Sequence, residues 1–288
     1  MAIFGFVGLG NMGGPMAARV AAVVPGTLGY DAAGTAERAG AGMAVCQNIA
    51  EIARRADAVF LSLPDGKVVA AVAEEIAQAP GRRAALVVDL STIGIAAARA
   101  AAAALARHGI RYLDAPVSGG VTGAKRGTIA VMAAGAAEDV ARARPAFEAM
   151  AKNIFHVGTE PGQGQAMKLL NNFLSATAMA ATSEAVLFGE ANGLEMKTML
   201  DVLNVSTGQN TATSDKFVNR VLTGSFDAGF AARLMHKDVA LYREALEAAG
   251  TTKEVGATVE AMWRRVGEKV GDGDFTRIYT QLKGGGKT

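Results

Sequence analysis

Short apolar runs alternate with longer amphipathic or alanine-rich stretches through the first half of the chain. A short apolar run predicts a buried strand, and apolar positions with a period near 3.6 predict a helix. The predicted strands cover residues 2–7, 27–30, 44–45, 58–63, 85–90, 111–115, 128–133 and 153–157. The predicted helices cover residues 15–24, 35–39, 49–55, 68–78, 95–108 and 138–150. Strands separated by helices of this length form right-handed crossovers, so the pattern predicts a doubly wound, mostly parallel α/β sheet.

The pattern changes after Gly158, where strand signals end. Residues 165–191 carry apolar side chains at helical spacing and predict one long helix. Further helices are expected at residues 196–202, 214–222, 231–249, 253–269 and 275–284. We therefore expect an α/β domain over residues 1–161 and an all-helical domain over residues 162–288, joined by the long helix. The C-terminal Gly286-Lys287-Thr288 lacks P-loop spacing and is expected to be a frayed end.

A glycine motif lies between the first predicted strand and the first predicted helix. In Gly8-x-Gly10-x-x-Gly13 the first glycine permits a tight turn, the second lets the backbone approach a pyrophosphate, and the third lets the helix pack against the strand. A glycine-rich turn that binds nothing is the alternative, but the strand and helix on either side favour a Rossmann-type dinucleotide-binding domain. The cofactor-binding residues predicted in this turn are Gly8, Leu9, Gly10, Asn11, Met12 and Gly13.

An acidic residue follows at the position that such a domain requires. Asp31 ends the second predicted strand, 18 residues after Gly13. A carboxylate there accepts hydrogen bonds from the ribose hydroxyls of the adenosine and repels a 2′-phosphate. The sequence therefore favours NAD over NADP, and we expect NADP preference to rise in Asp31→Ala.

Composition narrows the function further. The formal net charge is +2 and no run of five like charges occurs, which argues against a nucleic-acid partner. The single cysteine, Cys46, cannot form an internal disulfide, and no signal peptide or membrane span is predicted, so we expect a cytoplasmic protein. The three histidines are scattered, with no spacing typical of metal ligands, so no metal is expected.

Three polar turns follow predicted strands. They are Leu63-Pro64-Asp65, Leu90-Ser91-Thr92 and the stretch from Pro116 to Gly120. Any one could be an ordinary turn, because proline, glycine and serine form turns everywhere. Ligands of doubly wound sheets bind at the carboxyl ends of the strands, so three polar turns at that edge favour a binding site.

The long predicted helix carries a candidate for proton transfer. Lys168 and Asn172 are four residues apart and share one helix face. Partial removal from water makes a lysine ammonium easier to deprotonate, so the amine could take a hydroxyl proton as hydride leaves the same carbon for nicotinamide. From the helix alone, an exposed lysine is the commoner interpretation.

Four stretches, Gly5–Met16, Asp114–Ala124, Gly162–Asn172 and Gly229–Asp238, resemble the ordered signatures of the β-hydroxyacid dehydrogenases. That family includes 3-hydroxyisobutyrate dehydrogenase and tartronate semialdehyde reductase. The resemblance implies a 6-phosphogluconate dehydrogenase-like helical domain, a homodimer or homotetramer, and reversible oxidation of a small 3-hydroxy acid to its semialdehyde. It also implies residue roles. They are Lys168 as general acid/base; Ser118, Gly119, Gly120 and Asn172 as substrate ligands; Leu63, Pro64, Thr92 and Lys237 as cofactor contacts; and Asp238 as support.

Departures from the family patterns limit the alternatives. Asn171 stands where phosphogluconate dehydrogenases carry histidine, which argues against decarboxylation of a sugar phosphate. Imine reductases replace the lysine that is present here as Lys168. A reductase of the succinic semialdehyde or glyoxylate type stays open. So does a catalytically silent, cofactor-binding interaction protein, although the presence of Lys168 argues against it.

Overall fold

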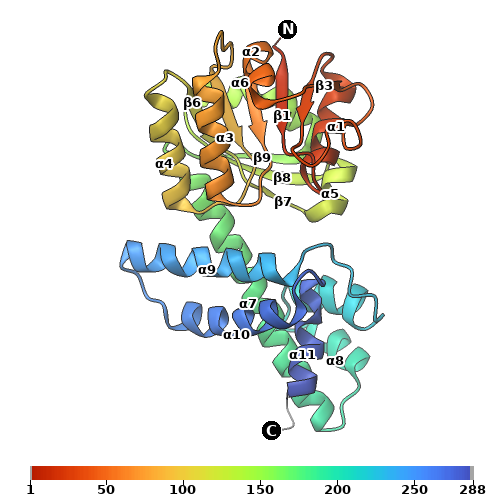
Figure 1. Ribbon diagram of the computed structural model, residues 1–288. Helices are drawn as coiled ribbons and strands as arrows, with labels where there is room; N and C mark the ends of the chain where they lie inside the picture. Colours follow the sequence, from red (N-terminus) through yellow and green to blue (C-terminus); the bar gives the residue numbers. More distant parts are fainter. Residues whose placement is uncertain (1, 286–288) are drawn as a thin grey trace. The chain divides into compact units, whose positions relative to one another are not determined.

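The computed structural model describes residues 2–285 and divides into two compact units, Met1–Lys168 and Leu169–Thr288 (Figure 1). The division falls inside one long helix, so the domain boundary predicted after residue 161 stays a prediction. The frayed end predicted at 286–288 lies outside the described residues. Each unit is described by itself below.

One mixed sheet of nine strands forms the centre of the first unit. Its strands are β1 Phe4–Val7, β2 Leu28–Tyr30, β3 Ala44–Val45, β4 Ala58–Leu61, β5 Leu86–Asp89, β6 Arg111–Asp114, β7 Val117–Ser118, β8 Ile129–Ala134 and β9 Ala151–Gly158. They are ordered β3-β2-β1-β4-β5-β6-β8-β7, with β9 paired to β8. The first six are parallel and have the order of a dinucleotide-binding sheet, which confirms the predicted fold class.

Helices cover both faces of this sheet (Figure 1). They are α1 Gly13–Val23, α2 Ile49–Arg55, α3 Gly66–Gln78, α4 Ile95–Ala106, α5 Gly120–Arg126 and α6 Ala137–Met150. Side chains alternate between the two faces of the parallel strands. Phe6 and Phe60 stack with ring centroids 4.9 Å apart in the core shared with α1 and α6, whereas Val59 and Leu61 pack with α2, α3 and α4.

Two local predictions are wrong. The helix expected at residues 35–39 is a turn. Gly34 has φ +112°, and the Asp31 N–H donates to the Thr35 hydroxyl oxygen at 2.9 Å, so residues 31–35 form a hydrogen-bonded turn and no helix follows. The turn expected at 116–120 contains β7 and the first residue of α5, because Val117 and Ser118 pair antiparallel with Val131 and Ala130 of β8.

The second unit is all-helical in its described part. Its elements are α7 Gln163–Ala191, which begins in the first unit, α8 Met196–Leu203, the π-wound helix η1 Ala212–Val221, α9 Ala232–Ala249, α10 Glu254–Val270, the 3₁₀ helix η2 Phe275–Arg277 and α11 Ile278–Gly285. Trp263 is fully buried in its core and donates to the Ala176 carbonyl oxygen at 3.1 Å. Within residues 2–285, every helix is too short or too polar to cross a lipid bilayer.

Candidate active site

The glycine turn after β1 is shaped by close backbone contacts. Gly8 has φ +91°, and its N–H donates to the Tyr30 carbonyl oxygen at 2.9 Å. A Cβ on Gly13 would lie 2.0 Å from the Gly8 carbonyl oxygen, so α1 can start this close to β1 only from a glycine. The N-terminus of α1 therefore opens directly at the carboxyl end of β1, where the positive end of the helix dipole favours an anion.

Gly10 has a different surrounding. A Cβ built on it meets no described atom within 4 Å, and its backbone is outside the left-handed region. No contact within the described protein requires glycine at this position. An open space beside the first turn of a helix fits a pyrophosphate lying against the backbone, so the residues present suit a dinucleotide.

Asp31 lies at the end of β2, beside this turn. Its Oδ2 accepts from the Leu9 N–H at 2.7 Å, and its Oδ1 accepts from the Ala33 N–H at 2.8 Å. The Arg38 guanidinium is 3.7 Å from the same Oδ1. These contacts hold the carboxylate in one orientation and leave lone pairs on both oxygens for ribose hydroxyls.

The turns after β4 and β5 are tied together. The Leu63 N–H donates to the Ser91 hydroxyl oxygen at 2.8 Å, and the Ser91 N–H donates to Asp89 Oδ1 at 2.9 Å. Leu63, Pro64 and Thr92 therefore follow neighbouring parallel strands at one edge of the sheet. Asp89 itself is fully buried, and burial raises its pKa to about 6 even though Ser91 and Tyr112 donate to it.

The start of α7 is anchored to the same edge. Asp114, the last residue of β6, accepts from the Gly162 N–H at 3.0 Å and from the Gln165 N–H at 2.9 Å. Burial raises the pKa of its carboxyl, and the backbone N–H donors oppose that rise. These contacts satisfy N–H groups that a helix start leaves unpaired. Sequence reasoning missed the anchoring roles of Asp114 and Gln165, although Asp114 begins one of the family-like stretches.

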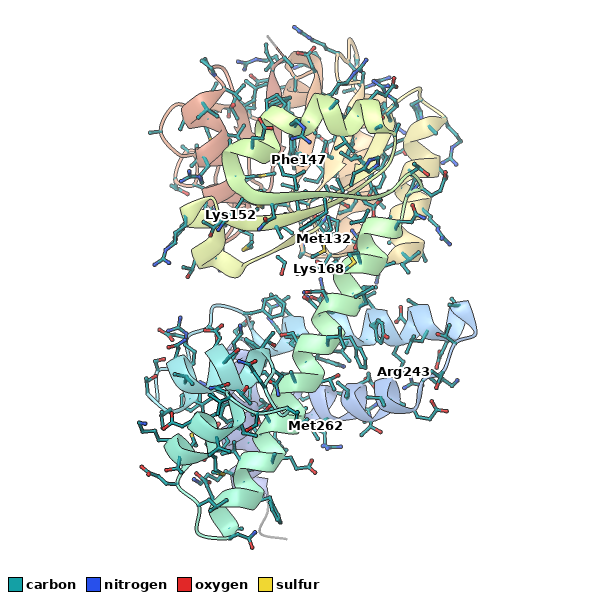
Figure 2. All side chains as sticks on the ribbon, turned by 180° about the vertical axis from the view of Figure 1, so that it is seen from behind. Met132, Phe147, Lys152, Lys168, Arg243 and Met262 are labelled. Carbon is teal, nitrogen blue, oxygen red and sulfur yellow. The ribbon has the colours of Figure 1, made fainter. Side chains whose placement is uncertain are left out.

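Lys168 lies in the second turn of α7 and is 8% exposed (Figure 2). The alternative of an exposed surface lysine does not fit this burial. Four residues along α7, Asn172 is also buried, and its amide donates to Asp238 Oδ2 at 2.6 Å. Lys237 Nζ lies 3.4 Å from Asp238 Oδ1, so the predicted residues Asn172, Lys237 and Asp238 form one cluster in the second unit.

Ser118 ends β7, Gly119 joins this strand to α5, and Gly120 begins α5. Gly119 has φ +133° and Gly120 has φ +63°. A side chain on Gly119 would also crowd Ile129, because its Cβ would lie 3.2 Å from Ile129 Cα. Consecutive residues in these conformations present backbone N–H groups in a way that other residues rarely allow. Within residues 2–285, no cluster of three histidine, cysteine or acidic side chains could hold a metal ion.

Comparison with known proteins agrees with this arrangement. Residues 3–158 match the family model of the NAD binding domain of 6-phosphogluconate dehydrogenase. Residues 162–282 match the model described as NAD-binding of NADP-dependent 3-hydroxyisobutyrate dehydrogenase. A probable 3-hydroxyisobutyrate dehydrogenase of Mycobacterium tuberculosis is 35% identical, with 98% of each chain covered.

Two further relatives are similar over most of their length. An NAD-dependent L-serine dehydrogenase of Pseudomonas aeruginosa is 36% identical, with 90% of each chain covered. The solved structure of the M. tuberculosis 3-hydroxyisobutyrate dehydrogenase with L-serine has a TM-score of 0.89 at 34% identity, covering 98% of this chain and 99% of that one. The chain therefore belongs to the β-hydroxyacid dehydrogenase family and is an NAD(P)-dependent oxidoreductase acting on a CH–OH group.

Proposed function

We propose that this protein oxidises the terminal hydroxyl group of a small 3-hydroxy acid to the aldehyde, reversibly, with Lys168 as general acid/base. The observation that carries the proposal is the burial of Lys168 in the first turns of α7, whose start is bonded to the ligand-binding edge of the sheet. In oxidation, the Lys168 amine takes the hydroxyl proton. In reduction, the Lys168 ammonium returns a proton to the carbonyl oxygen.

NAD, when bound, supplies the hydride acceptor. Its pyrophosphate would be held by the turn from Gly8 to Gly13, and its adenosine ribose by Asp31. The ribose and nicotinamide would be contacted by Leu63, Pro64 and Thr92, and Lys237 is a further proposed cofactor contact. The Asp31 carboxylate supports a preference for NAD, because it would face the 2′-phosphate of NADP.

The substrate carboxylate would be held by the Ser118 hydroxyl and the backbone N–H groups of Gly119 and Gly120, with Asn172 orienting the hydroxyl. Relatives are named for 3-hydroxyisobutyrate and L-serine, which share a carboxylate and a hydroxymethyl group on one carbon. We therefore propose 2-substituted 3-hydroxypropanoates as the substrate class, glycerate included. A homodimer or homotetramer and a cytoplasmic location stay predictions.

Activity over a panel of hydroxy acids tests this proposal. The panel is 3-hydroxyisobutyrate, glycerate, L-serine, 4-hydroxybutyrate and glycolate, with NAD and NADP. We expect Lys168→Ala to lower kcat by about 10²–10⁴-fold on the best substrate, because proton transfer is lost, while the Kd for NAD changes less than about threefold. Lys152→Ala is the matched control, since Lys152 is an exposed lysine on β9 of the same unit (Figure 2).

Two results would contradict the proposal. NAD binding without turnover on any acid, unchanged in Lys168→Ala, would favour a catalytically silent binding protein. Turnover only on 4-hydroxybutyrate or glycolate would instead favour a reductase of the succinic semialdehyde or glyoxylate type.

A further inference from the structure

The side chain of Gln165 is fully buried, although it carries a polar amide. Its Oε1 accepts from the backbone N–H groups of Ile93, at 2.9 Å, and Gly94, at 3.1 Å. Its Nε2 donates to the Ser91 carbonyl oxygen at 3.0 Å. Each of these bonds satisfies a buried polar group, and losing one leaves that group unpaired. The Gln165 amide therefore fixes the backbone of the loop between β5 and α4.

The bonds lie on both sides of Thr92. Ser91 and Ile93 are its neighbours in the chain, so the main chain before and after Thr92 is bonded to one amide. The Ser91 hydroxyl also accepts from the Leu63 N–H at 2.8 Å, which adds the loop after β4 to the same network. Through these bonds Gln165 fixes the loops that carry Leu63 and Thr92, which are two of the proposed cofactor contacts.

Gln165 is itself part of α7, the helix that carries the proposed acid/base, and its backbone is also bonded to the sheet. Its own N–H donates to Asp114 Oδ2 at 2.9 Å. Lys168 follows three residues later, so the two side chains are neighbours on the surface of α7. A Cβ on Gly164 would lie 2.6 Å from the Met132 carbonyl oxygen, so the helix start cannot easily move relative to the sheet.

We propose that Gln165 is a positioning residue for the reaction: it sets the spacing between the nicotinamide-side loops, at Leu63 and Thr92, and the amine of Lys168. It acts through these residues, and the inference rests on the proposed function. Hydride transfer and proton transfer occur at the same substrate carbon and its oxygen, so small changes in this spacing lower the rate strongly.

The experiment compares NAD with ADP-ribose, which lacks the nicotinamide ring. In Gln165→Met, which conserves size and removes the three side-chain bonds, we expect NAD to bind about tenfold more weakly by calorimetry. ADP-ribose should bind within about twofold of wild type, because the groups proposed to hold it, the glycine turn and Asp31, share no described hydrogen bond with Gln165. We expect kcat to fall at least about tenfold and the KM for the hydroxy acid to change less.

Gln163→Met is the matched control. Gln163 lies two residues earlier, is exposed, and accepts only from the Glu160 N–H, at 2.9 Å, among the hydrogen bonds described for its side chain. It should leave both affinities and kcat near wild type. If Gln165→Met does not fold, Gln165→Glu replaces it: a carboxylate still accepts from Ile93 and Gly94 but cannot donate to the Ser91 carbonyl oxygen.

The outcomes separate the two proposals. Equal losses of NAD and ADP-ribose affinity, or an unchanged kcat, in the variant that folds would show a structural role only and overturn the inference. Wild-type protein that binds NAD but oxidises no hydroxy acid would overturn the proposed function, and this inference with it.

Discussion

Two aspartates at the carboxyl ends of buried strands of the first unit have different surroundings. Asp31, after β2, is bonded to backbone N–H groups at the edge of the sheet and lies near Arg38. Asp89, at the end of β5, is enclosed, and desolvation raises its pKa to about 6. The first carboxylate is the one proposed to bind the adenosine ribose. The second supports the loop that begins at Ser91, and its charge is a source of instability near neutral pH.

Asp31→Asn should raise the NADP/NAD ratio of kcat/KM by about tenfold or more, because the change removes a charge that repels the 2′-phosphate and leaves Arg38 to attract it. Initial rates with both cofactors measure the ratio. Asp57→Asn is the matched control, since Asp57 also accepts from a backbone N–H, that of Ile3, and pairs with Arg83, but lies at the amino end of β4. An unchanged ratio in Asp31→Asn would remove Asp31 from the ribose site.

Asp89→Asn should stabilise the protein increasingly as pH rises. Because the folded pKa of Asp89 is raised from 3.8 to about 6, the folded state binds more protons than the unfolded state between these values. The favourable contribution is complete below about pH 4 and is lost as pH rises through about 6. Between about pH 5 and pH 7.5, the stability of Asp89→Asn relative to wild type should grow by about 1 kcal/mol in denaturant titrations. A difference independent of pH would contradict the raised pKa.

At the scale of elements, the strand–turn–helix from β1 to α1 determines what the first unit can bind. Gly13 is required by the close approach of α1 to β1, whereas Gly10 has no neighbour in the described protein that would exclude a side chain. The same motif thus contains one glycine that serves the fold and one that suits a ligand. Substitutions at the two positions should therefore have separable effects.

Gly13→Ala should destabilise the cofactor-free protein by about 1–3 kcal/mol, because its Cβ would overlap the Gly8 carbonyl oxygen. Gly10→Ala should leave the thermal midpoint at or slightly above that of wild type and weaken NAD at least about tenfold, because the added methyl group would occupy the space proposed for the pyrophosphate. Thermal unfolding and calorimetry measure the two effects. Tight NAD binding by Gly10→Ala would place the pyrophosphate elsewhere.

Whether an element could be predicted from the sequence depends on how far apart in the chain the residues that determine it lie. The glycine turn and most strands and helices of the first unit were predicted because their signals are local. The bonds from Gln165 to the Ser91 loop were not, because the partners are 71 to 74 residues apart and glutamine has no distinctive pattern. The pairing of β9 with β8, and the π winding of η1, likewise depend on packing that no local pattern reports.

At the scale of the whole molecule, the order of the parts could be predicted better than their detail. An α/β half followed by a helical half was expected from the loss of strand signals after Gly158, and both halves match family models. The substrate could not be predicted, because relatives of similar identity are named for different hydroxy acids. The oxidation of a hydroxy acid, which these relatives have in common, is the part of their chemistry that applies to this chain.

The open space beside Gly10 has a thermodynamic meaning for the protein before it meets any cofactor. Glycine gives the unfolded chain extra conformational freedom, and alanine at a compatible position typically adds about 0.4–1 kcal/mol of stability. By keeping glycine, the chain forgoes that gain in its empty form. A screen for heat resistance alone would therefore tend to select Gly10→Ala. By the prediction above, such a variant would be more stable than wild type but would bind NAD weakly.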